Sequence, residues 1–341
     1  MRHSPSIFVL FALAAAGLLA CGGAAVKLYD EDRGTPNTPI RSGARNFAFR
    51  GGLADAQRAL REGDNEGARK LLEQHLEQEP ESIVAHYHLG LLHMDAGRFE
   101  PARTHLERAC KLEPELFGAC SNLGVLYLDH GEDAAALRVL EQAAQVAPKD
   151  VRVLLNLGNA RMRRGLWSGA VDAYNAALAQ APGHGTALYN LGLAYAARHR
   201  WPEALATADK ALVYRPGFAQ ARALRVAALT AKGELDLAIR EGEADLERIR
   251  PAVENHVALG RALLRKGRVE DALERLHVAV QLDGGSPLAR MNYGEALDAT
   301  GRRADAAAQY RAFLKLPYRR LEDSRRLRRR LRELEADKKA R

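Results

Sequence analysis

Small and large apolar residues recur at fixed intervals along most of this chain. From about Phe49 to Arg320 the pattern repeats every 34 residues without insertion or deletion, so that eight units align. One position is alanine in every unit: Ala68, Ala102, Ala136, Ala170, Ala204, Ala238, Ala272 and Ala306. Twelve residues earlier, glycine occupies six of the eight units and usually follows a large apolar residue. Such small side chains within a helical stripe indicate two helices that cross at close range in each unit.

Turn-forming residues mark where these helices end. Seven of the eight units carry a glycine five residues before the alanine, and His199 stands in the remaining unit. A turn between helices often needs positive φ at such a position, which glycine tolerates. Proline ends the second helix in five units, because it cannot donate the next helical hydrogen bond. The pattern therefore predicts an all-α fold of eight helical hairpins, at 49–82, 83–116, 117–150, 151–184, 185–218, 219–252, 253–286 and 287–320.

These hairpins resemble the tetratricopeptide repeat. The resemblance is carried by segments such as 87–93 (YHLGLLH) and 189–195 (YNLGLAY), and the repeats cover about four fifths of the chain. It implies a right-handed superhelical solenoid that binds a protein or an extended peptide segment along a concave groove. The unit 219–252 departs most from the family pattern, notably at Arg225, Val226, Gly242 and Asp245, and we expect a local bend or a contact surface there.

A row of asparagines is the most informative polar feature of the repeats. In the tetratricopeptide family, the residue just before the packing position of the first helix faces the concave groove. Asparagine stands there four times: Asn122, Asn156, Asn190 and Asn292. Their amides either pair with the backbone of an extended peptide or contribute only solvation and local hydrogen bonds. The resemblance places five more side chains on the same surface: Tyr87, Arg152, Asn159, Arg163 and Tyr189.

Basic residues gather past the last repeat. The chain has a formal net charge of +8, and residues 301–341 alone contain fifteen Arg and Lys against six Asp and Glu. Leu327, Leu331 and Leu334 have helical spacing, which predicts a capping helix at 321–341 over the end of the solenoid. Its arginines form either a solvated face or a contact for an anionic partner: Arg325, Arg326, Arg328, Arg329, Arg330 and Arg332.

The start of the chain has the features of an export signal. A basic start precedes an apolar run at 7–19, which is short for a membrane span. The run ends in LLAC, which resembles a bacterial lipobox. The resemblance implies a lipoprotein signal peptide at 1–20, lipidation of Cys21 and an outer-membrane anchor facing the periplasm. An ordinary cleaved signal and an uncleaved anchor are the alternatives. Residues 21–48 lack apolar periodicity and are predicted to form a flexible tether.

Histidines and cysteines are the remaining candidates for chemistry. His86, His88 and His93 cluster in the sequence, but His86 and His93 take packing positions of a first helix while His88 points to a different face, so no metal site is predicted. Cys110 and Cys120 flank the turn between two units, and they either form a disulfide or serve as small core residues. We find no P-loop, dinucleotide fingerprint, zincin motif or nucleophile elbow. The sequence therefore predicts neither an enzyme nor a bound cofactor.

Three functions are compatible with these features. The first is a non-catalytic scaffold lipoprotein of the bacterial envelope, which holds a partner during assembly or operation of an envelope machine. This architecture resembles lipoproteins that assist type IV pilus secretin assembly and tetratricopeptide lipoproteins of gliding motility. The second is an adaptor for peptidoglycan or outer-membrane biogenesis enzymes. The third, a cytoplasmic nucleic-acid or regulatory adaptor, requires a false lipobox, and we predict no nucleic-acid partner.

Overall fold

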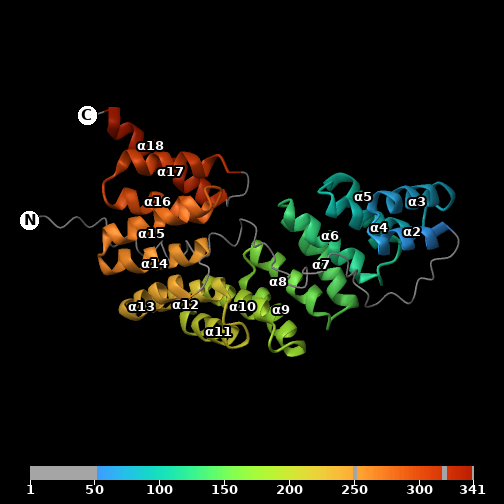
Figure 1. The fold of residues 1–341 in the computed structure, drawn as a ribbon, viewed down its shortest axis with the longest axis horizontal. Helices are drawn as coiled ribbons and strands as arrows, with labels where there is room; N and C mark the ends of the chain where they lie inside the picture. Colours follow the sequence, from blue (N-terminus) through green and yellow to red (C-terminus); the bar gives the residue numbers. More distant parts are fainter. Residues whose placement is uncertain (1–51, 249–251, 317–320, 340–341) are drawn as a thin grey trace, which may run out of the picture. The chain divides into compact units, whose positions relative to one another are not determined.

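The computed structural model describes residues 52–248, 252–316 and 321–339, in which every regular element is an α-helix. The helices are α2 (Gly52–Glu62), α3 (Asn65–Gln78), α4 (Ile83–Asp95), α5 (Phe99–Leu112), α6 (Phe117–Asp129), α7 (Asp133–Val146), α8 (Val151–Arg163), α9 (Trp167–Gln180), α10 (Gly185–Ala197), α11 (Trp201–Tyr214), α12 (Ala219–Lys232), α13 (Leu235–Arg248), α14 (Val253–Lys266), α15 (Val269–Leu282), α16 (Pro287–Ala299), α17 (Arg303–Leu314) and α18 (Leu321–Lys339). From α4 to α16, every second helix begins 34 residues after the previous one. Consecutive helices pack as hairpins (Figure 1), which confirms the predicted all-α fold.

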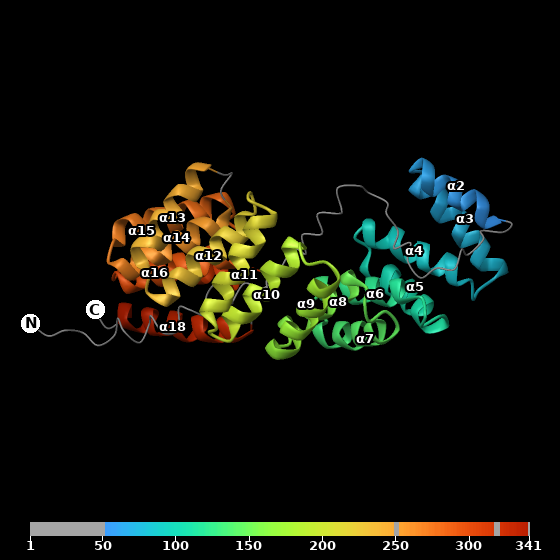
Figure 2. The ribbon, with the colours of Figure 1, turned by 90° about the horizontal axis from the view of Figure 1, so that it is seen from below.

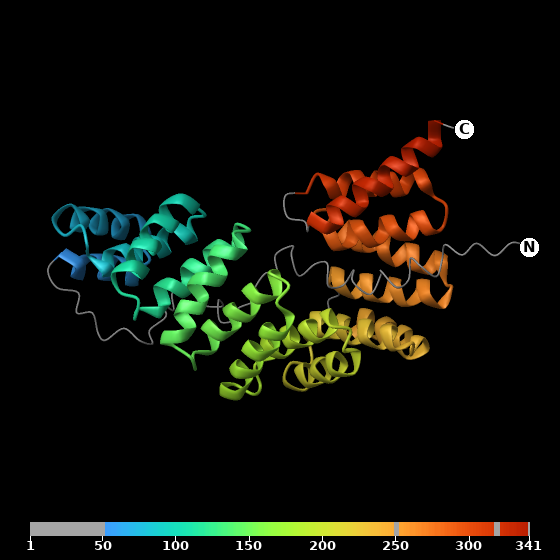
Figure 3. The same ribbon diagram turned by 180° about the vertical axis from the view of Figure 1, so that it is seen from behind.

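The described residues divide after Ala181 into two compact units. The N-terminal unit contains α2 to α9, and the C-terminal unit contains α10 to α18. Figures 2 and 3 show the hairpins of each unit from two further sides. Within the N-terminal unit the first helices α4, α6 and α8 contact one another in sequence order, and within the C-terminal unit α10, α12, α14 and α16 do the same. Each unit is thus a stack of hairpins.

A glycine on the first helix allows the second helix of the same hairpin to approach. A Cβ atom added to Gly90 would lie 2.6 Å from Leu106 Cγ, and one added to Gly294 would lie 2.6 Å from Tyr310 Cε1. Both large partners are almost completely buried. In the core of these hairpins a glycine of the first helix therefore packs directly against a large side chain of the second helix. Any larger residue at the glycine position would force the two helices apart.

The hairpin of α12 and α13 reverses this arrangement. Val226 stands at the position where six first helices have glycine. Gly242 stands at the position that Leu106 occupies in the hairpin of α4 and α5. A Cβ atom on Gly242 would lie 3.1 Å from Leu259 Cδ1, so a leucine of α14 occupies the space that a large side chain of α13 would need. The reversal keeps this part of the C-terminal unit filled with apolar side chains.

The polar residues of the same hairpin are paired inside the C-terminal unit. Asp245 is only 4% exposed and forms an ion pair with Arg222. Arg225 reaches Asp209 at 3.0 Å and Glu241 at 3.1 Å. Two of the departures that led us to expect a local bend or a contact surface, Arg225 and Asp245, thus form ion pairs between neighbouring helices.

Positive φ angles mark the turns within the hairpins. Seven glycines have φ between 67° and 88°, and His199 adopts φ 56° in the turn between α10 and α11. Histidine enters this left-handed region more readily than β-branched residues do. The one interruption of the glycine series in the sequence therefore keeps the backbone conformation of the other turns.

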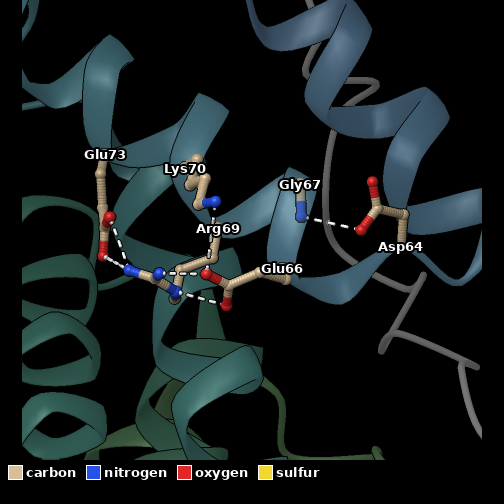
Figure 4. A network of polar contacts seen from close by, with 6 residues as sticks. All are labelled: Asp64, Glu66, Gly67, Arg69, Lys70 and Glu73. Carbon is tan, nitrogen blue, oxygen red and sulfur yellow. Dashed lines mark hydrogen bonds and ion pairs between the residues drawn. The ribbon is translucent and has the colours of Figure 1, made fainter.

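The start of α3 shows how a hairpin is capped locally (Figure 4). The backbone N–H of Gly67 donates to Asp64 Oδ1 at 2.8 Å, which satisfies one unpaired donor of the first turn. Arg69 lies between Glu66 and Glu73 on the same helix and reaches Glu73 Oε1 at 2.6 Å. Both carboxylates of these ion pairs are exposed, so the pairs add little to stability beyond fixing the arginine.

Candidate functional site

Two of the predicted asparagines link successive first helices of the N-terminal unit. Asn122 Nδ2 donates to Tyr87 Oη at 3.2 Å, and Asn156 Nδ2 donates to Ser121 Oγ at 3.3 Å. Each bond joins a residue to one 35 positions earlier, so the repeat itself places both. An amide has two N–H groups and a carbonyl oxygen, and these bonds use one N–H of each asparagine. The remaining amide atoms are the groups that a ligand would meet.

The predicted arginines of α8 differ in their surroundings. Arg152 is 40% exposed at the start of the helix and lies 3.3 Å from Asp150. Arg163 is only 17% exposed, pairs with Asp133 at 2.6 Å and donates to the Leu128 carbonyl at 2.7 Å. Arg163 therefore connects α8 to α6 and α7, whereas Arg152 is accessible from solvent.

Four other predicted residues lie in the interior. They are between 2% and 7% exposed: Tyr87, Asn159, Asn190 and Asn292. Tyr174 Oη donates to Asn159 Oδ1 at 2.6 Å, and Asn292 Nδ2 donates to the Leu288 carbonyl of its own helix. Burial raises the pKa of Tyr87 to about 12, so its hydroxyl stays protonated at neutral pH. The burial of these four side chains leaves little of their surface for a partner to contact.

Predicted residues with exposed surface remain in each unit. In the N-terminal unit, Asn122, Arg152 and Asn156 lie on the neighbouring helices α6 and α8, and we call them the α6–α8 polar surface. In the C-terminal unit, Tyr189 is half-buried and its ring lies 5.3 Å from that of Phe218. Two amides and a guanidinium can bind backbone carbonyls or a carboxylate, so the α6–α8 polar surface is the candidate site.

Two of the six arginines of α18 are held by carboxylates of α16. Arg326 Nη2 lies 2.7 Å from Glu295 Oε1, and Arg330 donates to both carboxylate oxygens of Asp298 at 2.7 and 2.9 Å. Leu327 is 2% exposed and belongs to the apolar core of the last hairpins. Neither carboxylate was predicted as a partner from the sequence. The sequence feature that could have identified these pairs is an acidic residue 31 or 32 positions before the arginine, a separation close to one repeat.

The other four arginines of α18 face solvent: Arg325, Arg328, Arg329 and Arg332. Among the side chains that the structure describes, none of these four arginines has a carboxylate within ion-pair distance. The structure thus separates the predicted anionic patch into two arginines that fix the helix and four that are exposed.

Arg261 and Glu295 form a further charged cluster that sequence analysis missed. They stand 34 residues apart, at the same position of α14 and α16. Burial lowers the pKa of Arg261 to about 10. Burial also raises the pKa of Glu295, and Arg326 and Arg261 counter that rise. Charges of alternating sign therefore connect α14, α16 and α18.

The histidines of α4 and α5 pair with one another. His86 Nδ1 lies 2.9 Å from His105 Nδ1, and His86 Nε2 lies 3.0 Å from the Pro80 carbonyl oxygen. A neutral His86 that donates to this carbonyl accepts a hydrogen bond from His105. Burial, with the neighbouring His86 and His93, lowers the pKa of His105 to about 4. Across the described ranges, no three His, Cys, Asp or Glu side chains are arranged to hold a metal.

Cys110 and Cys120 are joined by a disulfide between α5 and α6, with their Cα atoms 5.0 Å apart. Both residues are buried, and the bond links the second helix of one hairpin to the first helix of the next. Cys21 lies outside the described residues. None of the helices in the described ranges combines the length and apolarity needed to cross a bilayer.

Comparisons with known proteins agree with this architecture. Two family models described as tetratricopeptide repeat match the chain, one at residues 59–123 and the other at 121–185 and 257–319. A tetratricopeptide repeat protein from Parabacteroides merdae superposes with a TM-score of 0.62 at 19% identity, covering 75% of this chain and 97% of that chain. Yeast Tom70 superposes with a TM-score of 0.60 at 13% identity, covering 97% of this chain and 72% of that chain. At these identities the likeness concerns the fold alone.

No curated protein matches the sequence. The two family models together cover more than half of the chain, and the helical hairpins lie where they match. The chain therefore belongs to the tetratricopeptide repeat family.

Proposed function

We propose that this protein is a non-catalytic scaffold lipoprotein of the bacterial envelope, which holds a partner during assembly or operation of an envelope machine. Tetratricopeptide repeat proteins generally act as protein-interaction scaffolds and bind peptides or proteins in a concave groove. The α6–α8 polar surface supports this role, because amide and guanidinium groups can bind the backbone of an extended segment with little dependence on its sequence.

The disulfide between Cys110 and Cys120 is the observation that carries the proposed location. Disulfides persist in oxidising compartments such as the periplasm and are rare in the cytosol. A disulfide that bridges two hairpins favours export, in agreement with the apolar run at 7–19. We propose that Cys21 carries the lipid and that the chain faces the periplasm from the outer membrane.

Metabolic labelling with palmitate tests the anchor directly. The wild-type chain should incorporate label, and the Cys21→Ser variant should not. The matched control carries Cys110→Ser and Cys120→Ser, and it should keep the label because the disulfide cysteines are not the lipidation site. A wild-type chain that lacks the label and is recovered in the cytosol would instead support the third function, that of a cytoplasmic adaptor.

Affinity capture separates the two envelope functions. A type IV pilus or gliding-motility role predicts secretin or motility subunits bound to the wild-type chain. The alternative, an adaptor for biogenesis enzymes, predicts peptidoglycan hydrolases and synthases or outer-membrane assembly enzymes instead. Replacing Arg152 with Glu should weaken capture in either case, because it reverses the one accessible charge of the α6–α8 polar surface. The same change at exposed Arg138 provides the control.

A further inference from the structure

Four arginines form a single exposed stripe along α18. Arg325, Arg328, Arg329 and Arg332 are spaced i, i+3, i+4 and i+7, which places them on one face of the helix over about 10 Å. The opposite face carries Leu327 and leucines that pack against the last hairpin. α18 lies beside α17 at the end of the C-terminal unit (Figure 1). We call these four residues the arginine stripe.

This charge arrangement is not needed to hold α18 in place. Arg326 and Arg330 already attach the helix to Glu295 and Asp298 of α16. Within the arginine stripe every neighbouring pair has the same charge, and like charges three or four residues apart destabilise a helix. Many exposed arginines elsewhere in the described ranges pair with a nearby carboxylate, as Arg302 does with Glu270 at 2.9 Å. The arginine stripe has no such partner among the described side chains, so an external anion would relieve the repulsion between its arginines.

The chemistry of the surface favours a protein carboxylate over a lipid surface or a nucleic acid. A helix that lies in a membrane interface exposes large apolar side chains beside its charges. On α18, however, Leu327 and Leu334 are buried against the protein. Glu333 and Glu335 pair with Arg330 and Arg311, so the exposed positive charge ends at Arg332 and offers only about 10 Å of contact, too little for an extended polyphosphate backbone. Guanidinium groups bind carboxylates bidentately, and the length of the stripe matches two turns of a helix or a few residues of an extended chain.

We infer that the arginine stripe of α18 is a second docking surface, which binds an acidic segment of a partner protein rich in Asp and Glu. This inference deepens the proposed scaffold function and rests on it, because it names the chemistry of one partner. It uses residues outside the α6–α8 polar surface, so the two can fail separately. Binding should rely on several ion pairs at once and should therefore weaken as salt screens them.

Fluorescence anisotropy with three probes tests the inference. The probes are a labelled glutamate-rich peptide, vesicles of phosphatidylglycerol and phosphatidylethanolamine, and double-stranded DNA. The mature chain, residues 21–341, is used with Cys21→Ser, so that neither the apolar run at 7–19 nor an attached lipid can bring it to the vesicles. The test variant replaces Arg325, Arg328, Arg329 and Arg332 with Gln. The control replaces four dispersed exposed arginines and so removes the same charge: Arg61, Arg138, Arg164 and Arg240.

We expect the peptide to bind the parent chain and to lose about tenfold to hundredfold in affinity for the stripe variant, but no more than about twofold for the dispersed control. Circular dichroism confirms that both variants remain helical. Equal losses of peptide affinity in the two variants would overturn the inference, since they would show that affinity depends only on the net charge of the chain. Stronger binding to vesicles or to DNA than to the peptide would also overturn it, as would no binding to any probe. Crosslinking at the α6–α8 polar surface would still test the scaffold function in each case.

Discussion

The contact between Gly90 and Leu106 gives the sharpest prediction about how the repeat specifies the fold. Alanine usually stabilises a helix relative to glycine by about 1 kcal/mol, so Gly90→Ala would be favourable on propensity alone. The new Cβ would instead lie 2.6 Å from Leu106 Cγ, inside a fully buried contact. Overpacking of this kind costs about 1–3 kcal/mol. We therefore expect Gly90→Ala to lower the free energy of unfolding by about 1 kcal/mol.

Removing the partner side chain should reverse the sign of this effect. Leu106→Ala alone should cost about 2–5 kcal/mol, because it leaves a cavity. In that background the methyl group of Gly90→Ala no longer meets Leu106 Cγ, and the helix propensity of alanine should stabilise the chain by about 1 kcal/mol. The two substitutions should thus be coupled by about 2 kcal/mol. The reversed pair of Val226 and Gly242 shows that the chain already accepts the opposite order elsewhere.

Urea denaturation of the four chains in a double-mutant cycle measures the coupling, and hydrogen exchange in α4 and α5 shows where it acts. The control is Gly97→Ala, which has no atom within 4 Å of the added Cβ but has φ 67°. It should destabilise by about 1 kcal/mol through backbone strain, independently of Leu106. Coupling below about 0.5 kcal/mol between Gly90→Ala and Leu106→Ala would refute the packing argument.

Three further results should follow from the structure. Replacing Cys110 and Cys120 with Ala should lower stability by about 3 kcal/mol, the value for opening a loop of this length. Non-reducing mass spectrometry of the wild type should find no free thiol at these positions, and two free thiols would contradict the prediction. Asp298→Asn should speed hydrogen exchange throughout α18 and lower stability by about 1–3 kcal/mol, because it weakens the bidentate pair with Arg330. Arg311→Gln removes the exposed Arg311–Glu335 pair and should lower stability by less than about 0.5 kcal/mol. Equal losses of stability in the two variants would contradict this prediction. Burial lowers the pKa of His88 and His105 to about 4, so between about pH 6.5 and 4 the unfolded chain binds protons that the native chain does not. The stability of the N-terminal unit should therefore fall as the pH falls through that window. His88→Leu should make this fall shallower, and an unchanged slope of stability against pH would contradict the prediction.

The fold could be predicted from the sequence because one constraint recurs in every unit. Small residues at 34-residue intervals report close helix crossings, and the structure places Gly90 and Gly294 against large side chains as expected. His199 was the one exception among the turn residues, yet it keeps positive φ. The reversal at Val226 and Gly242 could not be predicted, because it depends on Leu259 from the next hairpin filling the space.

The candidate site could be predicted less well, since repeat position does not fix how deeply a side chain lies. Asn156 and Asn190 occupy the same position of the unit, but Asn156 is half-buried and Asn190 is 2% exposed. The same limit applies to α18, where sequence alone treated six arginines as one group. Only Arg326 and Arg330 meet carboxylates of α16, and finding them required the packing of one hairpin against the next.

Photo-crosslinking in the native cells tests the central claim, that the N-terminal unit holds a partner protein on its first helices. A photoreactive residue replaces Asn156 on the α6–α8 polar surface, and the matched control replaces exposed Asp172 on the second helix α9. Mass spectrometry should identify one envelope protein crosslinked from position 156 and not from position 172. No crosslinked protein from position 156, or the same proteins from both positions, would contradict the account.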